Sequence, residues 1–172
     1  MQHRQRHDPS KSLVGFSVGE VQYAVAIARV KEITNPMRLV ELPHAPASVV
    51  GVADYRGEVV PVVDLRLRFG LSHSAATRKT KWIVVDVAGR TLALIVDAVT
   101  EVFGTGGADL RTPPSLGDGD DLRGIEGVTN FDGRLVFVLD IARFQSLTES
   151  FGSTAQIGPG VKISALPPER SA

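Results

Sequence analysis

Three aspartates come nearest to catalytic chemistry in this chain of 172 residues. Asp64, Asp97 and Asp140 each end or follow an apolar, strand-like run, where a carboxylate can act as a general acid or base. A carboxylate at a strand end can also accept backbone N–H bonds from the following turn. Because Asp64 recurs as Asp140 at the equivalent place in a repeated segment, we interpret these carboxylates as structural.

Other chemistry-bearing residues are scattered or missing. A metal site needs several ligands on ordered elements, and the histidines do not cluster. The chain has no cysteine, which excludes a disulfide and a thiol nucleophile. It lacks a GxSxG elbow and a GxxxxGK[ST] loop, and GTGGAD at residues 104–109 has no phosphate-binding lysine. We therefore expect no catalytic residue, no metal and no cofactor. The four histidines are His3, His7, His44 and His73.

Composition is typical of a globular protein that binds neither nucleic acid nor membrane. Nineteen basic and nineteen acidic residues cancel, and 6% of residues are aromatic, which argues against a nucleic-acid-stacking surface. No apolar run approaches the roughly 18 residues of a membrane span. The first residues lack the apolar core of a signal peptide. We expect a cytoplasmic protein with no direct membrane insertion.

The chain contains an internal duplication. GVADYRGEVVPVVDLRLRF at residues 51–69 recurs as GVTNFDGRLVFVLDIARF at residues 127–144, and YAVAIARVKEI at 23–33 matches LALIVDAVTEV at 92–102. These matches indicate two related units of roughly 70 residues each, a pseudo-symmetric pair. Short β-branched runs and glycine-marked turns in each unit predict a mainly β fold with few helices.

Local patterns predict most elements. We expect a hairpin from residues 13–18 and 21–27, a second from 82–87 and 91–96, and strands at 58–65 and 135–139. Pro61 must lie at an edge or a bulge, because it has no amide to donate. We also expect a short helix over 42–52, a loop over 104–121, a flexible leader over 1–12 and a flexible tail over 151–172. Gly51, Gly57, Gly127 and Gly133 are expected at turns with unusual dihedral angles.

Arg56 differs from the other turn residues because the second copy of the turn has Asp132 in its place. The fold therefore does not require an arginine there. A guanidinium on a turn is a good interaction anchor, since its planar donors pair with carboxylates or carbonyls. Equally, Arg56 is explained as a solvated side chain or as the partner of an internal acid such as Glu32.

The chain resembles the CheW family of bacterial chemotaxis adaptors and the CheW-like regulatory domain of the kinase CheA. The resemblance covers residues 13–147 and rests on YAVAI, VKEI, LPHAPASVVGVADYRG, VVPVVDLRLRFG, LIVDAVTEV and GVTNFDGRLVFVLDI. It implies two five-stranded SH3-like β-barrels in a domain spanning 13–150. Lobes are expected at roughly 13–75 and 76–150, with exchange of strands allowed. The family's usual turn block is closer to NLRG, so Asp54 and Tyr55 depart from it.

The resemblance also implies a function without catalysis. Proteins of this family couple the cytoplasmic tip of methyl-accepting chemoreceptors to the regulatory domain of CheA in membrane-associated arrays. Their motifs assign no kinase-contact residues in this chain. The alternatives are a specialised CheW-like accessory protein that binds only one of these partners, and an enzyme or nucleic-acid-binding barrel on the same fold. Carried over by position, the receptor-binding residues are Val30, Glu32, Ile33, Arg56 and Val99.

Overall fold

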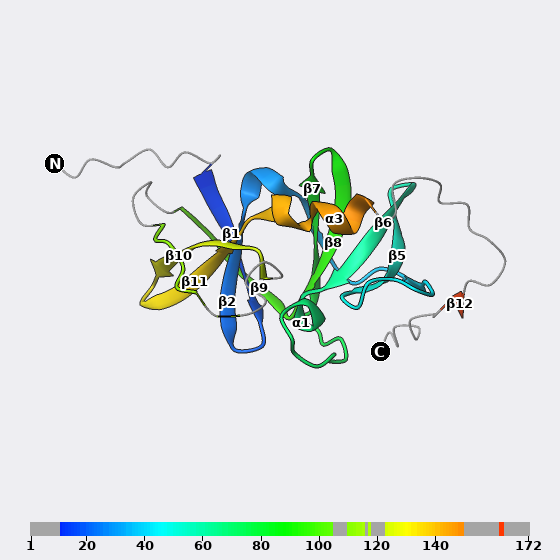
Figure 1. Ribbon diagram of the computed structural model, residues 1–172, viewed down its shortest axis with the longest axis horizontal. Helices are drawn as coiled ribbons and strands as arrows, with labels where there is room; N and C mark the ends of the chain where they lie inside the picture. Colours follow the sequence, from blue (N-terminus) through cyan, green and yellow to red (C-terminus); the bar gives the residue numbers. More distant parts are fainter. Residues whose placement is uncertain (1–10, 105–109, 116, 118–122, 150–161, 164–172) are drawn as a thin grey trace.

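The computed structural model describes residues 11–104, 110–115, 117, 123–149 and 162–163. Within them the chain forms two β-sheets and a few short helices, which confirms the mainly β fold (Figure 1). In the first unit the elements are β1 Ser12–Val18, β2 Val21–Ala26, η2 Ile27–Arg29, β3 Val30–Thr34, β4 Val40–Glu41, β5 Val49–Tyr55, β6 Glu58–Asp64 and α1 Leu65–Arg68. In the second they are β7 Lys81–Val87, β8 Arg90–Val96, β9 Ala98–Gly104, β10 Ile125–Phe131, β11 Arg134–Leu139, η3 Ile141–Phe144 and α3 Gln145–Glu149, followed by β12 Lys162–Ile163.

The two units exchange their first hairpins. The five-stranded sheet has the order β10-β11-β2-β1-β9, so the β1–β2 hairpin lies among strands of the second unit. The seven-stranded sheet has the order β12-β4-β5-β6-β8-β7-β3, so the β7–β8 hairpin lies among strands of the first. The strands are thus not divided between the sheets by a simple cut near residue 75. Closure of each sheet into a barrel stays a prediction of the resemblance.

The exchange is made by two equivalent parallel pairings. β11 runs parallel to β2, with Val138 opposite Ala24, and β6 runs parallel to β8, with Val62 opposite Ala93. All other strand pairings between the described residues are antiparallel. Because the same register recurs in both places, the duplication seen in the sequence is a pseudo-symmetry of the structure.

Among the described residues, the buried apolar side chains form three clusters. The largest lies between the sheets and includes Phe16 and Val25 from one sheet with Ile83 and Leu94 from the other. We call it the central cluster. Two smaller clusters belong to single sheets: one contains Val62 and Trp82, and the other contains their repeat equivalents Val138 and Leu13. Full burial of a Val, Leu or Phe side chain contributes roughly 1.5–3 kcal/mol, so the exchanged hairpins are firmly anchored.

Several local predictions are confirmed, and three are wrong. Both hairpins form as expected. Pro61 lies neither in an edge strand nor at a bulge, because β6 lies between β5 and β8 and Pro61 pairs regularly with Val52. The proline is accommodated because the pairing of β6 with β8 begins only at Val62. The helix expected over 42–52 is wrong, because the valines at its end form β5. Pro46 suggested a helix start, but it lies in the irregular connection that leads into β5.

Gly51 and Gly127 are not at turns but inside β5 and β10. A Cβ on Gly51 would lie 2.2 Å from the Val40 carbonyl oxygen, and one on Gly127 would lie 2.4 Å from Leu110 Cγ. Both glycines therefore allow close approach of a neighbouring segment. Gly57 and Gly133 do occupy turns, with φ of 83° and 76°.

Parts of the expected loop, leader and tail lie outside the described residues. The loop expected over 104–121 falls mostly there, as do residues 1–10 of the leader. Within the segment expected as a tail, β12 pairs antiparallel with β4.

Candidate functional site

Arg56 occupies the tip of the β5–β6 hairpin. Its φ of 51° and the φ of 83° at Gly57 are those of a type I′ turn, which matches the twist of the flanking strands. The turn is supported by Asp54 Oδ1, which accepts a hydrogen bond of 2.8 Å from the Gly57 amide. This backbone projects the Arg56 side chain outward, and 74% of its surface is exposed.

The guanidinium of Arg56 is held by two neighbours. Its Nη2 lies 2.9 Å from Glu32 Oε2, and its Cζ lies 5.5 Å from the centre of the Tyr55 ring. The Tyr55 hydroxyl donates a hydrogen bond of 2.8 Å to the same Glu32 oxygen. That bond to a carboxylate is the main cause that raises the pKa of Tyr55 above its ordinary value. The internal partner Glu32 named in the sequence analysis is therefore correct.

A second chain of contacts runs beside this ion pair. Lys31 Nζ donates to Thr91 Oγ1 at 2.9 Å, and Thr91 Oγ1 donates to Glu58 Oε2 at 3.1 Å. Lys31 Nζ also lies 5.9 Å from the Tyr55 ring centre. These six residues form one polar surface drawn from β3, the β5–β6 hairpin and β8, which we call the Arg56 surface: Lys31, Glu32, Tyr55, Arg56, Glu58 and Thr91.

The Arg56–Glu32 pair contributes little to folding. Exposed ion pairs are worth about 0–1 kcal/mol, and Glu32 is itself 35% exposed. Left-handed backbone costs a residue other than glycine, asparagine or aspartate roughly 1–2 kcal/mol. An arginine at this φ is thus not the residue that turn stability favours. An observed cost of this kind supports a role for the side chain beyond the turn.

The other residues predicted for the site fall into two groups. Ile33 follows Glu32 in β3 and is 38% exposed, and because successive side chains of a strand point to opposite faces, it lies outside the Arg56 surface. Val30 and Val99 are half-buried and pack against the central cluster. They occupy equivalent places in the repeat, one in each sheet, with Val30 opposite Val85 and Val99 opposite Phe16. The structure thus joins Glu32 and Arg56, leaves Ile33 exposed beside them in the sequence, and places the two valines against the central cluster.

The polar contacts of Tyr55 were missed from the sequence. Its hydroxyl binds Glu32, whereas Phe131 at the equivalent position has none. The contrast between tyrosine and phenylalanine in two copies of one turn was the available signal, because only tyrosine can orient a carboxylate. Lys31, Glu58 and Thr91 gave no comparable signal.

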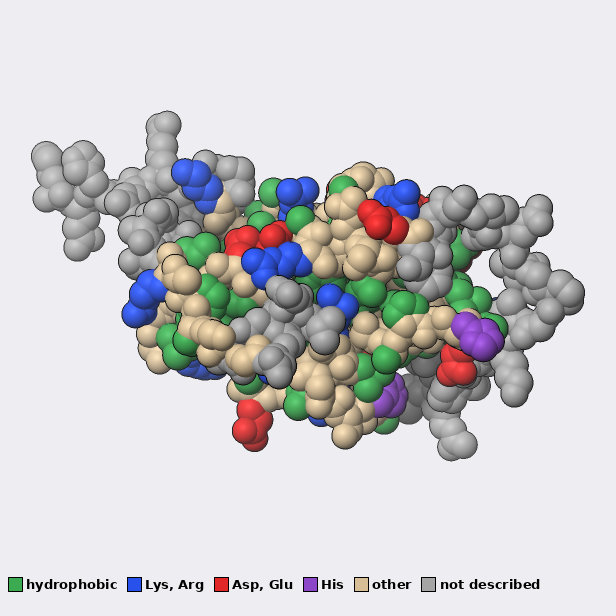
Figure 2. Space-filling model, in the orientation of Figure 1, with side chains coloured by type: hydrophobic (Ala, Val, Ile, Leu, Met, Phe, Trp, Pro, Cys, Tyr) green, Lys and Arg blue, Asp and Glu red, His purple; other side chains and the backbone are tan. Residues whose placement is uncertain are grey.

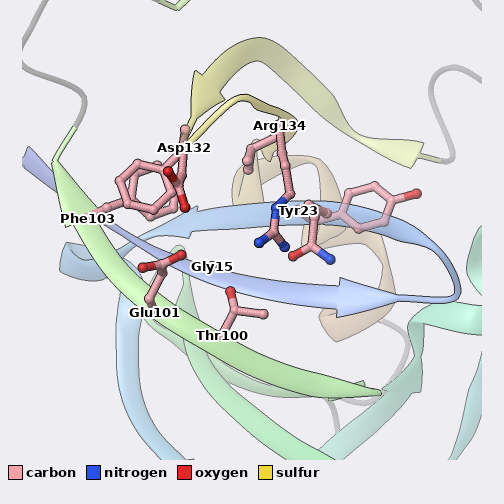
Figure 3. Close-up of a pocket in the computed structure, with 10 residues that line it drawn as sticks. Gly15, Tyr23, Thr100, Glu101, Phe103, Asp132 and Arg134 are labelled. Carbon is pink, nitrogen blue, oxygen red and sulfur yellow. The ribbon is translucent and has the colours of Figure 1, made fainter.

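The second unit carries a hollow where the first carries the Arg56 surface. It is lined by residues of β1, β2, β9 and the β10–β11 hairpin (Figure 3). The repeat aligns Glu101 with Glu32, Phe131 with Tyr55, and Asp132 with Arg56. We call this hollow the Asp132 pocket. Its lining residues are Gly15, Gln22, Tyr23, Thr100, Glu101, Phe103, Phe131, Asp132, Arg134 and Val136.

The three aspartates considered for catalysis have structural contacts. Asp64 Oδ1 accepts from the Arg66 amide at 2.9 Å, and Asp140 Oδ1 accepts from the Ala142 amide at 3.0 Å, so each caps a short helix. Asp97 Oδ2 accepts from the Gly19 amide at 2.7 Å and pairs with Arg66 Nη1 at 2.6 Å. The structural interpretation of these side chains is confirmed.

The described residues contain neither a metal-binding cluster nor a membrane-spanning helix. In the part of the chain that the structure describes, no group of three His, Cys, Asp or Glu side chains could hold a metal ion. None of the helices described there is long and apolar enough to cross a membrane. On the face shown in Figure 2, acidic and basic side chains are interspersed with apolar ones. That face presents no continuous basic patch of the kind that binds nucleic acid.

Comparisons with known proteins give a consistent result. Residues 12–148 match the family described as CheW-like domain. The "Chemotaxis protein CheW" of Rhizobium meliloti is 31% identical over 131 residues, covering 76% of this chain and 84% of the relative. That of Helicobacter pylori is 31% identical over 129 residues, covering 74% and 77%. The crystal structure of the scaffolding protein TtCheW from Thermoanaerobacter tengcongensis aligns with a TM-score of 0.71 and 28% identity, covering 81% of this chain and 90% of that one.

Proposed function

Because this chain belongs to the CheW-like domain family, which matches residues 12–148, we propose that it is a non-catalytic adaptor of a chemotaxis pathway. Its partners are the cytoplasmic tip of a methyl-accepting chemoreceptor and the regulatory domain of the kinase CheA. The observation that carries the proposal is the match over nearly the whole described chain to proteins named for chemotaxis and scaffolding. The protein resides in the cytoplasm, at membrane-associated receptor arrays.

The Arg56 surface is the proposed receptor contact, together with Ile33, Val30 and Val99. The Arg56 surface presents an exposed guanidinium and a carboxylate that keeps one oxygen free of Arg56 and Tyr55, and Ile33 adds an exposed apolar side chain on the strand that carries Glu32. Charged groups flanking an apolar anchor suit a helical partner that docks by its side chains. Arg56 and Glu32 can exchange their mutual contact for contacts to the receptor without loss of the fold, since their ion pair is exposed.

The adaptor acts by differential binding. A ligand shifts a conformational equilibrium only as far as it binds the two states unequally. An adaptor that contacts receptor and kinase at separate surfaces transmits a receptor rearrangement to the kinase through this difference in binding free energy. No covalent step in this chain is needed.

Calorimetric titration of the full chain tests the proposal, with a receptor-tip fragment and a CheA regulatory domain as titrants. Both are expected to bind. Arg56→Ala is expected to weaken receptor binding by about 1–3 kcal/mol, the range of an interface anchor, and to leave kinase binding and the melting curve unchanged. Arg78→Ala is the matched control, because Arg78 is also exposed but lies in the loop before β7.

Unchanged receptor affinity in a normally folded Arg56→Ala protein would remove Arg56 from the contact. Binding of only one titrant would indicate a one-sided accessory protein, and binding of neither would overturn the adaptor proposal.

A further inference from the structure

The Asp132 pocket has the same layout as the Arg56 surface but lacks its arginine. In the first unit, a guanidinium lies against Glu32 and above the Tyr55 ring. In the second, the equivalent acid Glu101 and the equivalent ring Phe131 are present, and the turn residue is Asp132, with the same φ of 51°. The second unit thus has an acid and an aromatic ring arranged as in a guanidinium site, without a guanidinium of its own at the tip of the turn.

The carboxylates of this pocket are free to bind a cation. No ion pair or side-chain hydrogen bond in the described part of the chain involves the carboxylates of Glu101 and Asp132. Figure 3 shows both carboxylates directed into the hollow beside the Phe103 ring, Glu101 from β9 and Asp132 from the β10–β11 turn. A cation between them would meet two negative charges, where Arg56 meets one.

The aromatic wall of the pocket favours a guanidinium in particular. Phe103 and Phe131 stack with their ring centres 4.2 Å apart and their planes 23° from parallel. Phe103 is buried, so the stack is fixed in place by the cluster beneath it. Guanidinium ions stack on aromatic faces and at the same time donate paired hydrogen bonds to carboxylates. A lysine ammonium would use the carboxylates but less of the ring surface.

Arg134 lies in the same pocket but on the side away from Phe103 (Figure 3). Its side chain is exposed and makes no ion pair among the described residues. It replaces Glu58 of the first unit, so the pocket has two acids and one base in place of the first unit's balanced set. The pocket therefore has a net negative charge. Arg134, beside the two acids, can bind an acidic residue that neighbours a basic residue in a partner segment.

We propose that the Asp132 pocket binds an arginine side chain presented by a partner protein, with Glu101 and Asp132 pairing with its guanidinium and the Phe103–Phe131 stack supporting it. The partner segment supplies in trans the group that Arg56 supplies within the chain in the first unit. This inference does not rest on the adaptor function, since it follows from the repeat and from the chemistry of the pocket.

Nuclear magnetic resonance with a small probe tests the pocket directly. Isotope-labelled full chain is titrated with acetyl-arginine-methylamide, and separately with acetyl-citrulline-methylamide, which has nearly the same shape but no charge. The arginine probe is expected to give saturable shifts of backbone amides in β9 and in the β10–β11 turn. Its side-chain methylene protons should shift upfield, as stacking on the Phe103–Phe131 pair requires. The citrulline probe should do neither.

Variants assign the effect to the two carboxylates. Asp132→Asn is expected to lower the affinity for the arginine probe roughly threefold, as for partly exposed ion pairs. The Glu101→Gln/Asp132→Asn double variant is expected to lower it roughly tenfold. Glu32→Gln in the first unit is the matched control and should leave the probe's affinity unchanged. Both pocket acids are exposed, so these proteins should fold, and thermal melting verifies it.

Two results would overturn the proposal. One is the absence of saturable shifts in the pocket, or shifts that persist in the double variant. The other is probe binding that appears only in Arg134→Gln, because the chain's own Arg134 would then occupy the carboxylates in solution. Neither result bears on receptor or kinase binding, which the calorimetric titrations measure separately.

Discussion

The β5–β6 turn and the β10–β11 turn share one backbone geometry and carry opposite charges. Arg56 and Asp132 have the same φ of 51°, and each precedes a glycine with positive φ. Around Arg56 the side chains are joined by hydrogen bonds and an ion pair to Glu32 and Tyr55. Around Asp132 the equivalent Glu101 and Phe131 make no such contacts, and a pocket remains. Matching turn geometry with unequal side chains indicates that the duplication preserved the fold while the surface chemistry of the two turns diverged.

The buried interiors of the two sheets should be equally sensitive to substitution. Val62 and Val138 are buried at equivalent places, each opposite an alanine in the parallel pairing. We predict that Val138→Asp and Val62→Asp each lower the free energy of unfolding by several kcal/mol, because each buries an unpaired charge. Urea denaturation measures both.

A Val138→Asp protein that melts like wild type would show that the cluster beneath β11 is not a core. A loss confined to one variant would show that the two sheets are not energetically equivalent. Val138→Ala is the control, since it removes volume without adding charge.

Substitution of the helix caps Asp64 and Asp140 should lower the free energy of unfolding less than the core substitutions do, and by different amounts at the two caps. Asp64 is 3% exposed and binds both the Arg66 amide and His73 Nδ1, the latter at 3.0 Å. Asp140 is 35% exposed, and its ion pair with Arg143 is long, at 3.7 Å. Loss of an N-cap side chain costs about 0.5–2 kcal/mol. We therefore predict a loss near the upper end for Asp64→Ala and near the lower end for Asp140→Ala.

Thermal and urea unfolding of the two cap variants test this order. Asp64→Asn and Asp140→Asn are the controls, because asparagine is an equally good cap. Equal losses for the two alanine variants would mean that burial and the His73 contact add nothing to the cap at Asp64.

The sequence was sufficient to predict those features that both copies repeat. The hairpins, the turns at Gly57 and Gly133, and the caps at Asp64 and Asp140 depend on local chemistry, and the duplication provided a second instance of each. The segment at residues 42–48 was mispredicted, because a proline that suggests a helix start also suits an irregular connection into β5. The partner of Arg56 was one of several alternatives, since a contact between β3 and a distant turn depends on how the sheets close.

The Asp132 pocket could not have been predicted from the sequence. Glu101 and Phe103 share one strand, β9, but Asp132 comes from the β10–β11 turn, and nothing in the sequence spacing brings that turn to β9. The exchange of hairpins, which puts Gly15, Gln22 and Tyr23 of the first unit into the same wall, is likewise a property of the strand order. The sequence did show that the two copies of the turn differ, with Arg56 in one and Asp132 in the other. The structure shows that Arg56 pairs with Glu32, whereas Asp132 borders a pocket.

The smallest predicted effect on stability is the one that converts the second turn into the first. Asp132→Arg should place a guanidinium within reach of Glu101, as Arg56 lies against Glu32. The new exposed ion pair is worth at most about 1 kcal/mol, and arginine tolerates the left-handed φ less well than aspartate, so we expect the unfolding free energy to change by less than about 1 kcal/mol. Binding of the arginine probe should nevertheless be lost, because the chain then fills its own pocket. If Asp132→Arg melts like wild type and still binds the probe, the pocket is not the counterpart of the Arg56 surface. If probe binding is lost, and adding Glu101→Gln to the Asp132→Arg variant does not restore it, the result matches a site closed by its own arginine over the Phe103–Phe131 stack.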